Sequence, residues 1–416
     1  MKIAPISNAL FIRNRTRLAE MLEPGSVALV GSSSRKFRNG DQFYPYRQHS
    51  DFFYLTGINQ EESVLLIAPD QKEETFQEIL FLKKPTSKSI LWTGPGLTEG
   101  EATLLSGINQ VKALEELDHY MGKLFPRGSV LYTSGDVPLP RISEQFPDIN
   151  ITSLSAMMMI LRRVKEPEEL EEIRKACNIT RSAFRRILPL IRPGIWECEI
   201  EAEIIAEFIG RGANGPAYEP IVASGKNTLI LHYVENKDQC REGELVLLDF
   251  GAEVNNYASD CSRTVPVNGR FSKRQREVYD ALARVFMQAR ELMVPGTLMA
   301  DFHQGVGELW EEEHIALGLY SQQDTKNRQG GEPMWKDYFM HGTSHSMGLD
   351  VHDPCDRSIP FEPGMVITCE PAIYIKEEGF GIRLENDILI TPQGPVDLME
   401  DIPMEAAEIE EIMHSK

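Results

Sequence analysis

The sequence predicts an α+β protein of two domains, a smaller N-terminal α/β domain and a larger C-terminal domain. Three observations predict this: a length of 416 residues, short β-rich runs in the first part, and long amphipathic helices alternating with apolar strands in the second. A chain of this length exceeds one ordinary hydrophobic core. We place the domains at residues 1–160 and 161–416.

The N-terminal domain is expected to form around one sheet. Its β-rich runs are separated by polar or Gly- and Pro-bearing turns, with helical stretches between them. The expected strands are Ser26–Val30, Asp51–Thr56, Ser63–Ala68, Glu78–Leu82 and Ser129–Thr133.

The C-terminal domain is expected to contain four long helices. Proline and acids at 167–169 begin the first of them, because proline suits the first helical turn and acids suit the positive end of the helix dipole. Ser272 and Gln275 have the spacing of a capping box at the start of the third. The helices after the first are expected at about 197–209, from 272 to before Pro295, and at about 298–317.

Strands of this domain carry a short internal repeat. Two glycine turns, at Gly243 and Gly364, each lead into an apolar strand that ends six residues later in a carboxylate, and a second acid follows further along. The match is short enough to arise by chance. A genuine repeat would supply a pseudo-symmetric site with two acids from each copy, Asp249 and Asp260 from the first and Glu370 and Glu385 from the second. The clearest strands are Leu245–Phe250, Met365–Thr368 and Gly381–Ile390.

Asp249 and Asp260 are expected to share one face of a hairpin. Asn255–Asn256 is a plausible two-residue turn, which would place Asp249 opposite Ser262. Asp260 lies two residues from Ser262, and alternate residues of a strand face the same side. A register slip of one residue would separate the two aspartates, and two unrelated surface acids are the alternative.

Glu370 and Glu385, the second pair of acids, can also be interpreted without a shared site. Residues 381–388 alternate between apolar and polar, which places Arg383, Glu385 and Asp387 on one face of a strand that could simply be half-solvated. Glu370 ends an apolar strand. It must be exposed, paired or bound to a metal, because a lone buried charge is costly.

Three of the nine histidines lie within twelve residues, at His341, His345 and His352. One such histidine is more often a hydrogen-bonded core residue than a ligand, but three together among Gly, Ser and Thr indicate a site. His232, which follows the loop 224–227, does not indicate a site by itself.

Four carboxylates in one cavity would need counter-charge. Two charges about 4 Å apart repel by roughly 4 kcal/mol at an effective dielectric constant near 20. Two divalent cations would offset four carboxylates. Oxygen-rich ligation with one histidine suits Mn²⁺, with Co²⁺, Zn²⁺ or Fe²⁺ as alternatives. Two cations that are bridged by Asp or Glu carboxylates lower the pKa of a water that they share.

Composition limits the partners and the location. The formal net charge is −20, whereas nucleic acids and anionic membranes attract basic surfaces. The six cysteines form no CxxC pair, and neither a secretory signal nor a membrane-spanning run is evident. We therefore expect a cytoplasmic protein with reduced thiols and no nucleic-acid or membrane partner.

The chain resembles the aminopeptidase P (Xaa-Pro aminopeptidase) branch of the pita-bread metallopeptidases over nearly its whole length. The resemblance implies a C-terminal pita-bread domain and a ligand order Asp, Asp, His, Glu, Glu, which is specific at this spacing. The matching segments are 41–52, 223–227, 231–233, 248–251, 257–260, 341–353, 370–375 and 381–387.

The resemblance also implies a role for individual residues. The implied metal ligands are Asp249, Asp260, His345, Glu370 and Glu385, with Asp260 and Glu385 bridging the two ions. The implied catalytic residues are His232, His341, His352, Glu370 and Arg383, and the implied substrate-binding residues are Asp41, Trp92 and Tyr374. Trp92 is expected to reach the pocket of a neighbouring subunit in a homodimer or homotetramer.

The implied reaction releases the N-terminal residue from peptides that have proline at the second position, through attack by a metal-bridging hydroxide. A prolidase, which cleaves Xaa-Pro dipeptides with the same metal site, is one alternative, although the segment around Asp41 favours the aminopeptidase. A pita-bread binding protein without catalysis is the other, which the presence of all five ligands disfavours. Peptides are the expected partners.

Overall fold

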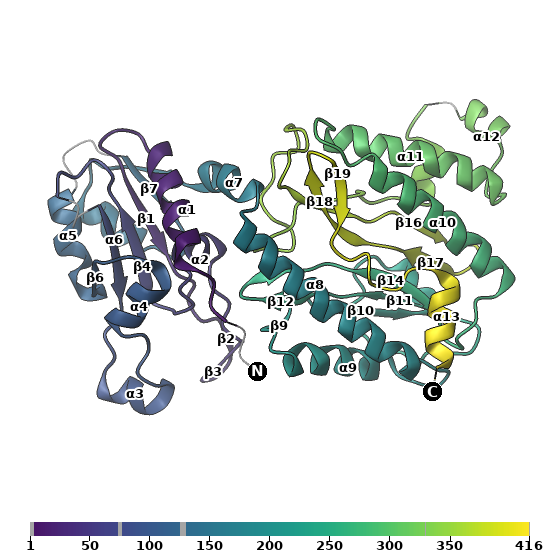
Figure 1. Ribbon diagram of the computed structural model, residues 1–416, viewed down its shortest axis with the longest axis horizontal. Coiled ribbons are helices and arrows are strands. Elements are labelled where there is room, and N and C mark those ends of the chain that lie inside the picture. Colours follow the sequence, from purple (N-terminus) through teal and green to yellow (C-terminus); the bar gives the residue numbers. More distant parts are fainter. Residues whose placement is uncertain (1–3, 74–76, 125–129, 329, 416) are drawn as a thin grey trace. The chain divides into compact units, whose positions relative to one another are not determined.

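The computed structural model describes residues 4–73, 77–124, 130–328 and 330–415, which divide into two compact units, one up to residue 162 and the other from residue 163 on (Figure 1). Both units combine helices and strands, so the predicted α+β class is confirmed. Within the described ranges, no helix is both long enough and apolar enough to cross a membrane.

The N-terminal unit contains a six-stranded sheet in the order β6-β5-β4-β1-β7-β8. The three middle strands β5, β4 and β1 pair antiparallel, and the outer strands are added in parallel. The bounds are β1 (Val27–Gly31), β4 (Ser63–Ile67), β5 (Glu78–Leu82), β6 (Val111–Ala113), β7 (Val130–Ser134) and β8 (Asn150–Ser153). Four of the five expected strands are confirmed, and Ser129 of the last lies outside the described residues.

Besides α2 (Ser50–Thr56) and α7 (Ser155–Arg163), five helices and a hairpin accompany this sheet. They are α1 (Asn8–Met21), β2 (Phe37–Asn39) with β3 (Gln42–Phe43), α3 (Ser87–Thr93), α4 (Glu99–Ser106), α5 (Leu117–Leu124) and α6 (Leu139–Gln145). The core between sheet and helices includes Val27, Leu66, Phe81, Met121 and Leu131.

The expected strand at Asp51–Thr56 is wrong, because these residues form helix α2 (Ser50–Thr56). Every residue of α2 is buried, and a short apolar segment buried on all sides has the same sequence pattern as a buried strand. Gly57 ends the helix with φ of +65°, and its N–H donates to the carbonyl of Phe53. A Cβ at Gly57 would lie 2.1 Å from the ring of Phe11, so this helix end requires glycine.

All four predicted helices of the C-terminal unit are confirmed. The capping box forms as expected, with the Ser272 side chain and the Gln275 side chain each accepting from the other's backbone N–H. The helices are α8 (Pro167–Ile187), α9 (Glu197–Gly210), α10 (Lys273–Glu291) and α11 (Met299–Ala316), and α13 (Ala406–His414) follows near the end of the chain. Figure 1 shows α8 and α9 on one side of the strands and α10 and α11 on another.

The strands of this unit form several small antiparallel sheets. The two that carry the expected acids are β10-β11-β14 and β15-β18-β19. Their bounds are β10 (Ile221–Ser224), β11 (Leu245–Asp249), β14 (Ser262–Pro266), β15 (Val366–Cys369), β18 (Asn386–Thr391) and β19 (Gly394–Asp397). The others are β9 (Gly215–Pro216), β12 (Ala252–Val254) and β13 (Tyr257–Ala258) in one sheet, with β16 (Ala372–Ile375) and β17 (Phe380–Arg383) in another.

The expected hairpin turn and register are confirmed. Asn255 and Asn256 have φ of +47° and +65° and form the two-residue connection between β12 and β13. Asp249 pairs with Ser262 across β11 and β14. The expected strand Leu245–Phe250 is confirmed as β11, and Met365–Thr368 corresponds to β15.

The expected continuous strand Gly381–Ile390 is wrong, because it is broken at Leu384 and Glu385 into β17 and β18. At the break, the N–H of Glu385 donates to the carbonyl of Ser262 at 3.1 Å, so Glu385 joins β14. The half-solvated face is also wrong: Asp387 is fully buried and accepts a bond from the N–H of Asp260 at 3.1 Å.

The internal repeat corresponds to similar backbone geometry in its two copies. Gly243 and Gly364 both have positive φ, +81° and +94°. Each copy then continues into a strand, β11 or β15, that pairs antiparallel with the strand after its second acid, β14 or β18. The ends of both copies meet at one cavity.

Candidate metal centre

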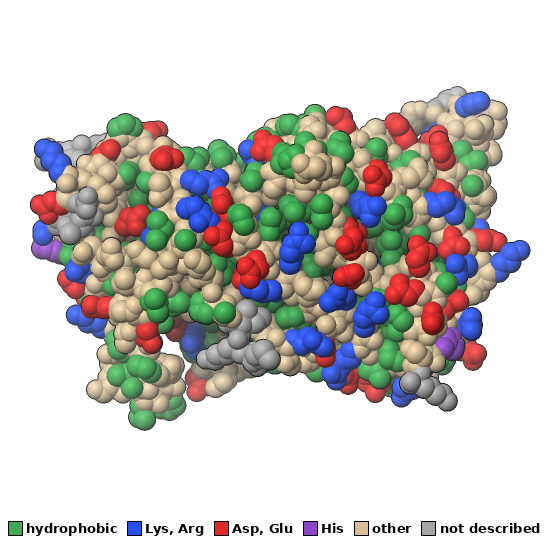
Figure 2. Space-filling model, viewed as in Figure 1, with side chains coloured by type: hydrophobic (Ala, Val, Ile, Leu, Met, Phe, Trp, Pro, Cys, Tyr) green, Lys and Arg blue, Asp and Glu red, His purple; other side chains and the backbone are tan. Residues whose placement is uncertain are grey.

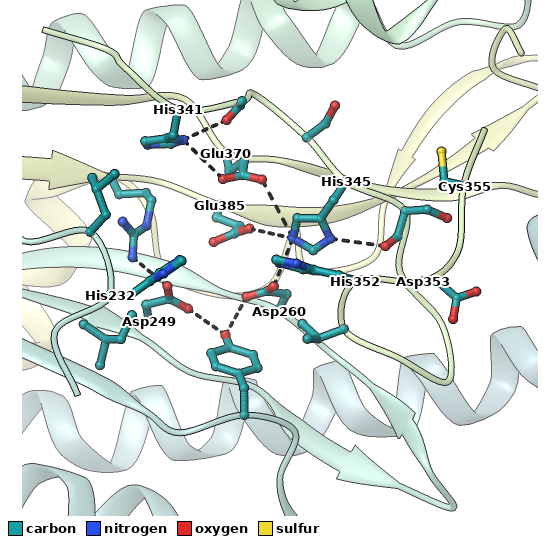
Figure 3. A pocket seen from close by; sticks show the side chains of 18 of the residues that line it. His232, Asp249, Asp260, His341, His345, His352, Asp353, Cys355, Glu370 and Glu385 are labelled. Carbon is teal, nitrogen blue, oxygen red and sulfur yellow. Dashed lines mark hydrogen bonds and ion pairs between the residues drawn. The ribbon is translucent and has the colours of Figure 1, made fainter. Parts of the chain in front are cut away.

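A cavity of about 610 Å³ lies in the C-terminal unit at the ends of these strands (Figure 3). Side chains from both copies of the repeat and from the histidine-rich segment line it. The predicted residues in its wall are His232, Asp249, Asp260, His341, His345, His352, Glu370, Arg383 and Glu385. The structure therefore brings all five predicted ligands and four of the other predicted residues to one place.

His345 lies close to three of the four carboxylates. Its Nε2 is 3.3 Å from Oδ2 of Asp260, 3.8 Å from Oε1 of Glu370 and 3.9 Å from Oε1 of Glu385. Its Nδ1 lies 3.2 Å from the carbonyl of Ser346, a position from which Nδ1–H donates and leaves Nε2 directed at the acids. Ligand atoms of Asp260, His345 and Glu385 all lie within 4.8 Å of one another.

Tyr218 connects the two aspartates. Its hydroxyl lies 2.7 Å from Oδ1 of Asp249 and 2.5 Å from Oδ1 of Asp260. Burial, and then the charges of these carboxylates, raise the pKa of Tyr218 well above its ordinary value, so the phenol keeps its proton. The hydroxyl therefore donates to one aspartate at a time and lies within hydrogen-bond distance of both.

Arg383 is the guanidinium nearest these acids among the described residues of the cavity wall. It donates from Nη2 to Oδ2 of Asp249 at 2.6 Å, from Nε to Oγ of Ser262 at 2.8 Å and from Nη1 to the hydroxyl of Tyr374 at 2.9 Å. The Ser262 hydroxyl in turn donates a hydrogen bond to Oε2 of Glu385 at 2.7 Å. One arginine thus orients ligands from both copies of the repeat.

Thr368 and His341 lie on two sides of Glu370. Oγ1 of Thr368 donates to its Oε1 at 3.2 Å, and Nδ1 of His341 lies 3.5 Å from its Oε2. His341 also donates from Nδ1 to the carbonyl of Gly342, and its Nε2 lies 3.0 Å from the hydroxyl of Tyr374. Burial lowers the pKa of His341 to about 3, so this imidazole is neutral.

His352 faces His345. The two ring centroids are 4.1 Å apart, and Figure 3 shows both rings directed into the cavity, with His232 on the opposite side of Asp260. Burial, followed by the charge of His345, lowers the pKa of His352. A neutral imidazole that lines a cavity can donate one hydrogen bond to a ligand.

Burial and mutual repulsion favour the protonated forms of the acids in this cluster. Burial raises the pKa of Asp249, raises the pKa of Glu370 to about 7 and raises the pKa of Glu385 well above its ordinary value, and the neighbouring acids add to the last shift. Burial would lower the pKa of His345, but its hydrogen bond to Asp260 and the charges of Asp260 and Glu370 raise it to about 9.

This donor set fits divalent metal ions. It supplies carboxylate oxygens and one imidazole nitrogen, whose second nitrogen is already engaged by a backbone carbonyl. Two divalent cations would offset the four acids and remove the repulsion that raises their pKa values. Hard oxygen donors with one imidazole suit Mn²⁺ and its neighbours in the first transition series.

Three predicted substrate-binding residues lie elsewhere. Tyr374 is buried behind the wall, bonded to His341 and Arg383. Asp41 is exposed in the hairpin between β2 and β3 of the N-terminal unit, where it accepts a bond from the Gln42 side chain at 2.9 Å. Trp92, on α3 of the same unit, is 77% exposed.

Several residues in or beside the site were not predicted. Ser262 was in the expected register but was not recognised as a hydrogen-bonding partner, although its place opposite Asp249 was a usable signal. Tyr218 gave no signal, because no pattern places a tyrosine 31 residues before Asp249 in contact with it. Further wall residues that were missed are Glu219, Ser344, Asp353, Cys355 and Arg357.

Comparison with known proteins places this site in a family. Residues 171–392 match the model of metallopeptidase family M24, and residues 11–132 match the aminopeptidase P N-terminal domain. The chain is 35% identical to the Xaa-Pro aminopeptidase of Escherichia coli (strain K12), with 99% of each chain covered. It superimposes on the structure of aminopeptidase P from E. coli with the inhibitor Pro-Leu with a TM-score of 0.88 at 34% identity, covering 99% of each chain. A zinc-substituted E. coli aminopeptidase P in complex with product gives the same values.

Proposed function

The chain belongs to the aminopeptidase P branch of metallopeptidase family M24, and from this we propose that it is an Xaa-Pro aminopeptidase that hydrolyses the bond between the first residue of a peptide and a following proline. The observation that carries the proposal is the convergence of four carboxylates and His345 on one cavity. A non-catalytic binding protein is disfavoured, because the chain belongs to a family of metallopeptidases and has this complete set of donors.

Five residues would hold the metal in the proposed enzyme. They are Asp249, Asp260, His345, Glu370 and Glu385, with Asp260 and Glu385 shared between two ions, most readily Mn²⁺. Bound divalent ions lower the pKa of water and polarise a carbonyl. The rest of the chemistry depends on the chain's own side chains.

Glu370 is proposed to move the proton. In hydrolysis, water adds its oxygen to the scissile carbonyl carbon, the carbon–nitrogen bond breaks, and one proton of that water passes to the proline nitrogen. The carboxylate of Glu370 can take this proton at Oε2 and release it. Thr368 donates to Oε1 and keeps this carboxylate in place, and the neutral His341 lies beside Oε2.

His352 and His232 are proposed to donate hydrogen bonds to the carbonyl oxygen. Both line the cavity, and negative charge develops on that oxygen as the water attacks. Arg383 is proposed to orient Asp249 and, through Ser262, Glu385. Selectivity for proline would come from a pocket shaped for a tertiary amide, which has no N–H to donate.

The aminopeptidase is favoured over a prolidase by the first domain. That domain matches the aminopeptidase P N-terminal domain, and the E. coli Xaa-Pro aminopeptidase aligns along the whole chain. The test compares an Xaa-Pro-Xaa tripeptide with the matching Xaa-Pro dipeptide on Mn²⁺-loaded protein. We expect release of the first amino acid from the tripeptide. Cleavage of the dipeptide alone would indicate a prolidase, and cleavage of neither by folded, metal-loaded protein would refute the proposal.

The remaining proposals concern the binding of the substrate's amino terminus, the oligomeric state and the cellular location. Asp41 is proposed to bind the substrate's amino group and Tyr374 to support the wall behind the substrate. A homodimer or homotetramer in which Trp92 reaches a neighbouring pocket is supported by the exposed side chains of Leu91 and Trp92, and Figure 2 shows hydrophobic side chains gathered over α3. A cytoplasmic location is supported by six cysteines that are all free thiols.

A further inference from the structure

A buried ion pair lies beside the cavity wall. Nζ of Lys165 is 3.2 Å from Oδ2 of Asp353, and both side chains are only 1% exposed. Burying two charges carries a large desolvation cost that good geometry only partly offsets, so such a pair is a poor source of stability alone. Its position next to His352 suggests a different use.

Asp353 closes the loop from Ser346 to Asp353. Its Oδ1 accepts from the N–H of Asp350 at 3.1 Å, and its own N–H donates to the carbonyl of Ser346 at 2.8 Å. One carboxylate therefore ties the middle of the loop, while the backbone joins the two ends. His345 directly precedes this loop, and His352 lies within it.

Gly348 allows the lysine to reach this carboxylate. A Cβ at Gly348 would lie 2.9 Å from Oδ2 of Asp353 and 2.9 Å from Cε of Lys165. The carbonyl of Gly348 also accepts from the N–H of Ala258 at 2.8 Å, which joins the loop to the hairpin that carries Asp260. Direct contacts therefore connect the loop, the ion pair and the hairpin.

Lys165 is itself held at both ends. Its N–H donates to the carbonyl of Gly364 at 2.9 Å, just before strand β15, which leads to Glu370. Its Nζ also lies 3.5 Å from the carbonyl of Arg163. Lys165 therefore connects the start of the second repeat copy, through its backbone, to the Ser346–Asp353 loop, through its side chain.

We propose that Lys165 is a positioning residue for the reaction, which acts through Asp353 to hold the Ser346–Asp353 loop so that His352 faces His345 and the reacting carbonyl. This inference rests on the proposed function for its kinetic consequence. It assigns a role to a side chain that does not line the cavity and that is separated from Asp353 by 188 residues of sequence.

The test is a double-mutant cycle between Lys165→Met and His352→Ala on the full-length, Mn²⁺-loaded protein. Loss of one well-placed hydrogen-bond donor to a developing oxyanion lowers kcat by roughly 100-fold. We expect each single variant to lower kcat by about 10- to 100-fold with KM changed less than about threefold. We expect the double variant to be no slower than His352→Ala, because both changes remove the same contribution.

Three further variants separate positioning from loss of stability. Lys165→Arg, which keeps the charge, should recover part of kcat. Val285→Ala, which truncates a buried core residue on α10, should lower the melting temperature and leave kcat unchanged. If Lys165→Met does not fold, the neutral pair Lys165→Met with Asp353→Asn replaces it, since it removes both charges.

A readout independent of activity distinguishes this inference from the proposed function. The imidazole signals of His352 in ¹⁵N-histidine NMR should shift or broaden in Lys165→Met and not in Val285→Ala. Unchanged His352 signals, an unchanged kcat in Lys165→Met, or losses that simply multiply in the double variant would each overturn the positioning role. A wild-type protein that cleaves no Xaa-Pro peptide would refute the proposed function, and the NMR comparison would still decide this one.

Discussion

Arg383 donates a hydrogen bond of 2.6 Å from Nη2 to Oδ2 of Asp249. Both side chains are largely buried, and the same guanidinium reaches Ser262 and Tyr374. A single arginine offsets one negative charge, whereas four carboxylates meet in this cavity. The unmatched charge is the physical reason for expecting cations here, and it leads to the predictions below.

Replacing Arg383 by lysine should damage the site despite the retained charge. A lysine ammonium is a point charge that cannot reproduce three bonds in fixed directions from one planar group. We expect Arg383→Lys to lower kcat/KM by about 10- to 100-fold in steady-state cleavage of an Xaa-Pro-Xaa peptide. Arg284→Lys, at an exposed pair with Glu313, is the control and should change little. Equal activity of the two variants would contradict the orienting role of Arg383.

Asp260→Asn should lose metal and activity but keep the fold. The amide has nearly the shape of the carboxylate but no charge with which to bridge two cations. We expect less than one ion per chain by elemental analysis, an unchanged far-ultraviolet circular dichroism spectrum, and no cleavage. Glu219→Gln, an exposed acid of the same cavity wall, should keep full metal content. Full activity in Asp260→Asn would refute the bridging role.

Tyr218→Phe should weaken the site without abolishing it. The change removes the hydroxyl that lies between Asp249 and Asp260 and leaves the ring in place. Loss of a hydrogen bond to a charged group costs about 1.5–3 kcal/mol, so we expect Mn²⁺ to bind about 10- to 150-fold more weakly. Calorimetric titration of metal-free protein measures this. An unchanged dissociation constant would show that Tyr218 does not hold the ligands.

His314 should make the protein sensitive to acid. It is fully buried on α11, stacks on Trp310 with ring centroids 4.8 Å apart, and its pKa is lowered by burial to about 3. The folded pKa lies below the unfolded value, so the contribution of neutral His314 is fully present above about pH 6.5 and is lost as the pH falls toward 3. In this window the unfolded chain binds a proton that the folded chain does not.

The check compares His314→Phe with the wild type by urea denaturation between pH 7 and pH 4. The free energy of unfolding of the wild type should fall relative to that of the variant, by up to about 1.4 kcal/mol for each pH unit below 6.5. Other titrating groups affect both proteins alike and cancel in the difference. Parallel stability curves would show that His314 is not the group responsible.

Local sequence patterns predicted the elements that carry the acids. The Asn255–Asn256 turn and the alternation along a strand were sufficient to place Asp249 opposite Ser262, because a two-residue hairpin leaves little freedom in register. The spacing of apolar residues also identified the four long helices of the C-terminal unit. These features depend on residues close in sequence.

Features that depend on tertiary contacts were missed. Helix α2 resembled a strand because its surroundings bury every side of it. The break before β18 arises where Glu385 bonds to Ser262, a contact between residues 123 apart in sequence. Tyr218 reaches the aspartates, and Lys165 reaches Asp353, only in the folded chain. No periodic pattern in a single sequence indicates such contacts between distant residues.

The central claim is that Asp249, Asp260, His345, Glu370 and Glu385 together hold two divalent cations. Anomalous-difference diffraction from crystals grown with Mn²⁺, measured on both sides of the manganese absorption edge, tests it most directly. We predict two peaks about 3.5–4 Å apart between these side chains, with Asp260 and Glu385 contacting both. A cavity without an anomalous peak at saturating Mn²⁺, or with a peak that these five residues do not contact, would contradict the account.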